Sequence, residues 1–158
     1  MKSIVVYASR YGNTQRIAEA IADGIRAHGS VELMPIEKAS TVFDGEADLV
    51  VIGCPTEGHM MTPAIRQFFD GLSGEAFKGV AAAAFDTRVD WPRWLSGSAG
   101  SGISDRLHKL GADVIVQQAS FIVEGKEPVL KAGEIERARA WGDTLGRTLR
   151  SEVAATAR

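Results

Sequence analysis

The chain is poor in the residues that build disulfide frameworks and metal sites. It has one cysteine, Cys54, among 158 residues. A single cysteine excludes an internal disulfide and a cysteine cluster, and it agrees with a reducing compartment. The three histidines (His28, His59 and His108) have no ligand-like spacing, so nothing in the sequence predicts a metal site.

Long apolar runs and an excess of basic charge are also missing. No stretch of about 18 apolar residues occurs, and no charged-then-apolar leader precedes the first expected strand, so we expect no membrane span and a cytoplasmic protein. A net charge of −2 and a pI near 5.9 argue against nucleic-acid binding. Without a linker or repeat, residues 1–150 are expected to form one domain, and residues 151–158 a frayed C-terminal tail.

Apolar runs alternate with segments of helical periodicity along the chain. Strands are expected at residues 3–8, 31–36, 48–54, 78–86 and 112–123, the second at a sheet edge because it contains a proline. Helices are expected at residues 14–28, from Pro63, at residues 101–110 and from Gly133. Residues 37–47 are expected to hold a short helix around residues 41–43 or none. The alanine run at residues 81–84 would also suit a helix. The alternation predicts an α/β fold, a three-layer doubly wound sandwich.

The turn between the first strand and the first helix reads Ser9-Arg10-Tyr11-Gly12-Asn13-Thr14. Unpaired amides at a helix N-terminus attract anions, short polar side chains add donors, and Gly12 allows close approach, so the turn suits a phosphate. The alternative is an ordinary helix cap by Asn13 or Thr14. The turn lacks the Gly-Lys-Ser/Thr of nucleotide-triphosphate loops and the Gly-x-Gly-x-x-Gly of dinucleotide sites.

This turn resembles the FMN-phosphate loop of flavodoxins, whose pattern is Ser/Thr-x-Thr/Tyr-Gly-Asn/Ser-Thr directly after the first strand. The resemblance extends over nearly the whole chain. It implies a five-stranded parallel sheet of order 2-1-3-4-5, with FMN at the carboxyl ends of the strands.

The loop after the third strand contains the flavodoxin pattern Gly-x-Pro-Thr followed by a glycine, met by Gly53, Pro55, Thr56 and Gly58. The resemblance implies that this loop flanks the flavin ring, with the candidate cofactor residues Pro55, Thr56, Glu57, Gly58 and His59. Many members carry a large aromatic residue here. This chain has His59, Met60 and Met61 instead, and the methionines suit either core packing or an apolar lip.

The loop over residues 87–100 is long for a compact domain, which is typical of a functional loop. The resemblance implies that it wraps the pyrimidine end of the flavin. The candidate residues here are Asp86, Thr87, Arg88, Trp91, Trp94, Gly97 and Ser98. Trp91 or Trp94 would stack on the ring, although we expect at least one of the two to close the core. Trp141 lies on the apolar stripe of the last helix and is expected to be structural.

The resemblance implies an FMN-binding electron-transfer protein whose partner is a redox protein. The alternatives are an FMN-dependent reductase of a small oxidant such as a quinone, and a flavin-free binding or regulatory domain. The chain is nearly neutral, whereas many flavodoxins are strongly acidic. It brings Arg10, Arg88 and Arg93 toward the expected flavin edge, against Glu57, Asp86 and Asp90. Cations favour a reduced, anionic flavin, so the sequence predicts a less negative potential than that of acidic flavodoxins.

Overall fold

The computed structural model describes residues 1–39 and 46–158, which form three layers with a sheet in the middle. The strands are β1 (Lys2–Tyr7), β2 (Ser30–Pro35), β3 (Leu49–Pro55), β4 (Ala81–Val89), β5 (Asp113–Val114), β6 (Ala119–Glu124) and β7 (Val129–Leu130). The helices are α1 (Asn13–Arg26), α2 (Ile36–Ala39), α3 (Pro63–Asp70), α4 (Arg93–Ser96), α5 (Ala99–Lys109) and α6 (Glu134–Thr156). The short helix expected around residues 41–43 lies outside the described residues.

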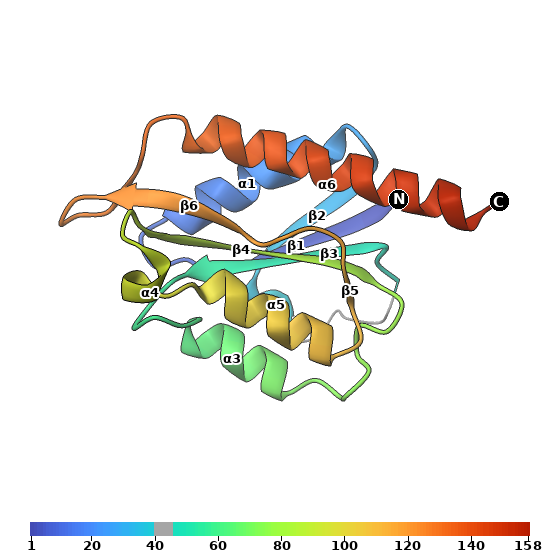
Figure 1. The fold of residues 1–158 in the computed structure, drawn as a ribbon, viewed down its shortest axis with the longest axis horizontal. Coiled ribbons are helices and arrows are strands. Elements are labelled where there is room, and N and C mark those ends of the chain that lie inside the picture. Colours follow the sequence, from blue (N-terminus) through green and yellow to red (C-terminus); the bar gives the residue numbers. More distant parts are fainter. Residues whose placement is uncertain (40–45) are drawn as a thin grey trace.

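The sheet has the order β2-β1-β3-β4-β6-β7, with β5 also pairing with β4. All pairs from β2 to β6 are parallel, and β7 is antiparallel to β6. Helices α1 and α6 cover one face, and α3 and α5 cover the other (Figure 1). The predicted flavodoxin-like order is confirmed, with the fifth position divided between β5 and β6.

The division of the fifth position follows from the register against β4. Between Ala82 and Phe85 of β4, the neighbouring chain runs from Val114 to Ala119 and therefore uses two more residues than β4 does. The residues between Val114 and Ala119 do not pair with β4. One of them, Gln118, donates its side-chain amide to Ser101 Oγ at 2.9 Å. A single strand over residues 112–123 was therefore a wrong prediction in detail, because the apolar pattern does not reveal an insertion in the pairing.

Strand β4 begins and ends about three residues later than the sequence predicts, at Ala81 and Val89. It continues because Thr87 pairs with Pro55 of β3, and Val89 pairs with Val123 of β6. Thr87 and Arg88 are therefore strand residues rather than loop residues. The alanine run lies in this strand, not in a helix.

The helix boundaries follow local capping chemistry. Thr62 caps α3 by accepting the Ile65 amide, and proline follows at the first helical position, as predicted. The last helix continues through Thr156, so the predicted frayed tail is helical to that residue, and residues 151–158 are all exposed. No Gly or Pro interrupts this end of the chain, which explains the continuation.

Aromatic packing joins the sheet to α6. The rings of Phe85, Phe121 and Trp141 meet edge to face, with centroids 6.2–6.5 Å apart. Trp141 is therefore a structural residue, as predicted. Among residues 1–39 and 46–158, no helix has both the length and the apolar content needed to cross a bilayer.

Candidate functional site

A pocket of about 310 Å³ lies at the carboxyl ends of the central strands. The loops after β1, β3 and β4 and the turn after β6 surround it, as expected for a sheet whose winding reverses between β1 and β3. Its lining residues are Arg10, Tyr11, Asn13, Thr14, Pro55, Thr56, Glu57, Gly58, His59, Thr87, Arg88, Val89, Trp91, Leu95, Ser96, Val123 and Pro128.

The start of α1 is open toward this pocket. Gly12 has φ +87°, in the left-handed region, and a Cβ there would have nothing within 4 Å. No side chain caps the helix at Gly12. Ser9 Oγ instead accepts the amides of Gly12 at 3.2 Å and Gln15 at 3.4 Å, which folds the turn back on itself. The amides of Asn13 and Thr14 have no acceptor within the helix and lie beside the cavity.

The polar side chains of this turn bind protein groups. Asn13 Nδ2 donates to the Pro128 carbonyl at 2.7 Å, and the hydroxyls of Thr14 and Thr87 lie 2.8 Å apart. In such a hydroxyl pair one group donates to the other, so one O–H remains available to a ligand. Ser9 and Gly12 do not line the pocket, and they shape the turn instead.

The loop after β3 is a tight turn. Glu57 and Met60 exchange two backbone hydrogen bonds, and Gly58 (φ +53°) and His59 (φ +69°) between them are both left-handed. A non-glycine residue in this region is strained, which is typical of functional loops. Gly97 makes this arrangement feasible, because a Cβ at Gly97 would lie 2.4 Å from the His59 carbonyl oxygen. Gly97 therefore serves loop packing and does not line the pocket.

The two methionines that follow His59 have different roles. Met61 packs against the core on the α3–α5 face, whereas Met60 is exposed. Core packing is confirmed for Met61, and an apolar lip at Met60, which does not line the pocket, stays a prediction.

The carboxylate of Asp86 lies beneath the site and not in it. Asp86 is fully buried, and its Oδ2 accepts Ser98 Oγ at 2.7 Å and the Gly100 amide at 2.9 Å. Ser98 in turn caps α5 by accepting the Ser101 amide. Asp86 and Ser98 do not line the pocket, and both side chains hold the start of α5; their place in the cofactor site stays a prediction.

The tryptophans of the β4–α5 segment are both exposed, Trp91 by 58% and Trp94 by 84%. The expectation that one of them closes the core is wrong, because the core under this segment is already filled from β3, β4 and α5. Trp91 lines the pocket, and Trp94 does not. Arg93 is exposed and also lies outside the lining.

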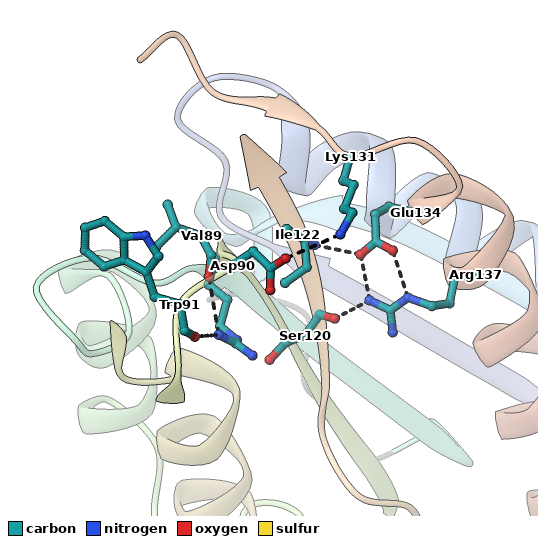
Figure 2. Close-up of polar contacts among 9 residues, drawn as sticks. Val89, Asp90, Trp91, Ser120, Ile122, Lys131, Glu134 and Arg137 are labelled. Carbon is teal, nitrogen blue, oxygen red and sulfur yellow. Dashed lines mark hydrogen bonds and ion pairs between the residues drawn. The ribbon is translucent and has the colours of Figure 1, made fainter. Parts of the chain in front are cut away.

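Ion pairs hold the rim of the pocket together. Arg10 lies 3.6 Å from Glu57 across the first two loops, and Lys131 lies 3.3 Å from Asp90. Figure 2 shows the second pair beside a further group in which Glu134 accepts the Ile122 amide at 2.6 Å and binds Arg137 at 2.7 Å. These contacts join the loop after β4, strand β6 and the start of α6.

Glu134 is the buried acid of this group, only 7% exposed. Burial alone would raise the pKa of its carboxyl, but the hydrogen bonds from Arg137 and the Ile122 amide outweigh burial, and the pKa is lowered. Arg137 also donates to the Ser120 carbonyl. The Glu134–Arg137 pair is therefore bonded to β6 at two residues, Ile122 and Ser120. The start of α6 is therefore fixed to the strand whose far end forms one wall of the pocket.

Cys54 lies near the carboxyl end of β3, next to the lining residue Pro55. Burial raises the pKa of its thiol to about 12, with hydrogen bonds to Thr62 lowering it only in part. The thiol is protonated and inert at neutral pH, as a packing residue would be.

The described residues contain no group of three or more His, Cys, Asp or Glu that could hold a metal.

Five lining residues escaped the sequence analysis: Val89, Leu95, Ser96, Val123 and Pro128. The first three follow from the longer β4 and the short α4, neither of which the sequence predicted. Pro128 lies in the turn between β6 and β7, and its carbonyl accepts Asn13 Nδ2 from the start of α1. Strands β3 and β4 separate β1 from β6, so the sheet order alone does not predict this contact.

Residues 5–141 match the sequence profile of the family described as Flavodoxin. The chain belongs to the flavodoxin family. Membership assigns it the cofactor of that family, FMN.

Individual relatives agree with this assignment. A flavodoxin from Aquifex aeolicus is 30% identical over 95 residues, 57% of this chain and 51% of the relative, so the match spans about half of that protein's length. A protein named NAD(P)H dehydrogenase (quinone), from Gluconacetobacter diazotrophicus, is 31% identical over 133 residues, 68% of this chain and 67% of the relative. The crystal structure of oxidised Flavodoxin 1 from Bacillus cereus covers 96% of this chain and 98% of its own, with a TM-score of 0.75 and 20% identity, which supports the shared fold.

Proposed function

We propose that this chain holds FMN in the pocket at the carboxyl ends of its strands and uses it to transfer electrons. The observation that carries the proposal is the start of α1, where Asn13 and Thr14 line a cavity that also has Trp91 in its wall. When bound, FMN supplies the electron-transfer chemistry. The residues of this chain bind it, orient it and control its surroundings.

The first turn suits the phosphate group. The amides of Asn13 and Thr14 offer donors, the helix start offers partial positive charge, and Gly12 leaves open space where a side chain would stand. The spare O–H of the Thr14–Thr87 pair supplies a further donor. In this proposal Arg10 adds little charge of its own, because Glu57 lies beside it.

The rest of the pocket suits a flat, largely apolar ring. Trp91, Val89 and Leu95 contribute apolar surface to the lining, and the tight turn of residues 57–60 also borders the pocket. Backbone groups of that turn are available to polar ring atoms, because Gly58 and His59 are exposed and line the pocket. The pocket volume of about 310 Å³ is at the low end for small-molecule sites.

The surroundings of the pocket favour an apolar electron acceptor. Among the described residues, seven of the eight large apolar side chains that are exposed lie on the segments around the site: Tyr11, Met60, Val89, Trp91, Trp94, Leu95 and Val129. An apolar rim of this size indicates a binding surface. It fits a redox protein with an apolar contact face, and it also fits a quinone, the second candidate, which the name of the Gluconacetobacter relative favours.

The two candidates differ in their assays. A quinone reductase oxidises NAD(P)H in the presence of a quinone without any second protein, whereas an electron carrier needs a reductase.

The proposal includes a cytoplasmic location, which agrees with a buried, unpaired thiol, and cell fractionation tests it.

FMN titration of the apoprotein tests cofactor binding at this site. We expect FMN fluorescence to fall on binding, because an indole that contacts a flavin quenches its emission. Trp91→Phe should retain more of the emission in the bound state, and Trp94→Phe, the matched control outside the lining, should behave like the unmodified chain. Unchanged FMN emission and absorbance at saturating protein would contradict the proposal.

A further inference from the structure

Arg88 is a cation in the pocket wall whose polar contacts are all neutral. Its Nη1 donates to the Trp91 carbonyl at 2.8 Å, to Ser96 Oγ at 3.2 Å and to the Val89 carbonyl at 3.3 Å. These acceptors all lie on the segment that follows it. One guanidinium nitrogen thus fixes the loop, and the buried Nε has no acceptor among the described residues.

The other cations near the site either pair with a carboxylate or lie outside the pocket lining. Arg10 has Glu57 beside it, and Lys131 has Asp90. Arg93 lies outside the lining and is exposed to solvent, where its field is screened. Within residues 1–39 and 46–158, no carboxylate forms an ion pair with Arg88.

Asp86 is the carboxylate closest to Arg88 on strand β4, and its Oδ2 binds the start of α5 rather than Arg88. It accepts two hydrogen bonds at the start of α5, where the helix dipole favours a negative charge. Glu57, the carboxylate among the described lining residues, pairs with Arg10, so Arg88 adds a positive charge to the wall that forms no ion pair there.

We propose that Arg88 sets the reduction potential of bound FMN by stabilising the negative charge that the flavin gains on full reduction. This inference rests on the FMN binding proposed above. Full reduction at neutral pH adds two electrons and one proton to the ring, which changes from neutral to singly negative. The electrons come from a reduced nicotinamide or a reduced partner protein in the cell, and from dithionite in the assay.

A potential shift requires different affinities for the two redox states. The oxidised ring carries no net charge and gains little from a nearby guanidinium. The reduced ring is anionic, and a half-buried cation is screened less than one in water. Arg88 therefore raises the affinity for reduced FMN more than that for oxidised FMN and makes the potential less negative.

The test compares the affinities for oxidised and reduced FMN in a set of variants. Arg88→Gln removes the charge, and Arg88→Lys keeps it. Val89→Glu keeps Arg88 and adds a carboxylate beside it at a partly exposed position that lines the pocket. Arg93→Gln is the matched control, since it removes an exposed charge outside the lining. Dithionite titration of the FMN-loaded proteins in equilibrium with a reference dye of known potential gives the potential, and fluorescence gives the affinity for oxidised FMN.

We expect Arg88→Gln and Val89→Glu each to weaken the affinity for reduced FMN at least tenfold relative to oxidised FMN, which corresponds to about 30 mV for a two-electron couple. Arg88→Lys should stay within about threefold of the unmodified ratio, and Arg93→Gln should not change it. An unchanged ratio in Arg88→Gln would overturn the proposal. If that variant does not fold, an unchanged ratio in Val89→Glu overturns it. An unmodified chain that binds FMN in neither redox state would refute the proposed function itself.

Discussion

Replacing Glu134 by glutamine tests how α6 is held against the sheet beside the site. The Glu134 carboxylate accepts the Ile122 amide at 2.6 Å and binds Arg137 through both oxygens, at 2.9 and 2.7 Å. Glutamine keeps the shape but loses the charge, and its NH₂ group faces a donor. Loss of a charge-assisted bond at a buried position costs about 1–3 kcal/mol in the free energy of unfolding.

That loss corresponds to a decrease in Tm of roughly 2–4 °C per kcal/mol for a chain of this size. The matched control is Glu136→Gln, which removes an exposed acid from the same first turn of α6. Urea unfolding at pH 7 should show the large loss for Glu134→Gln alone. Equal stabilities of the two variants would refute the reasoning.

The effect also has a defined pH dependence. The pKa of Glu134 is lowered in the folded protein, so the folded state binds this proton less readily than the unfolded state. The stabilisation is fully present above the unfolded pKa of about 4.3 and is lost as the pH falls toward the folded pKa. The stability difference between the unmodified chain and Glu134→Gln should therefore shrink below about pH 4. A difference that is constant from pH 7 to pH 3 would contradict the assignment.

Three further changes probe the packing, the cofactor turn and the thiol. Gly142→Ala should destabilise the protein by about 1–3 kcal/mol or more in thermal unfolding, because its Cβ would lie 2.2 Å from the Ile21 carbonyl oxygen and force α1 and α6 apart; a neutral effect would show that the helices separate freely. Thr14→Glu should abolish FMN binding in the titration, because it brings negative charge to the phosphate position and breaks the bond to Thr87; retained affinity would exclude this turn as the phosphate site. The Cys54 thiol, with a pKa of about 12, should react with a thiol reagent at pH 8 only after unfolding, and rapid reaction of the native protein would show that β3 opens at its end.

The fold was predictable because its signals are local. Apolar runs such as residues 48–54 fix a buried parallel strand, and Thr62 with Pro63 marks a helix start by capping chemistry. The turn around Gly12 has the left-handed glycine and the helix start that its pattern indicates.

The errors concern pairing and partners, which depend on segments far apart in the sequence. Strand β4 continues to Val89 because it pairs there with β6. The Asp86 side chain is directed to the start of α5 by its hydrogen bonds with Ser98 and the Gly100 amide. Trp94 is exposed because side chains from other segments already fill the core beneath it. None of these can be read from composition or periodicity within one segment.

The central claim is that the first turn binds the phosphate of FMN, and backbone amide NMR tests it most directly. Labelled apoprotein is titrated with FMN and, separately, with riboflavin, which has the same ring and no phosphate. The account predicts that the amides of residues 9–14 shift strongly with FMN and little with riboflavin, whereas those of residues 57–60 respond to both. Equal responses of residues 9–14 to the two ligands, or no response to FMN, would contradict it.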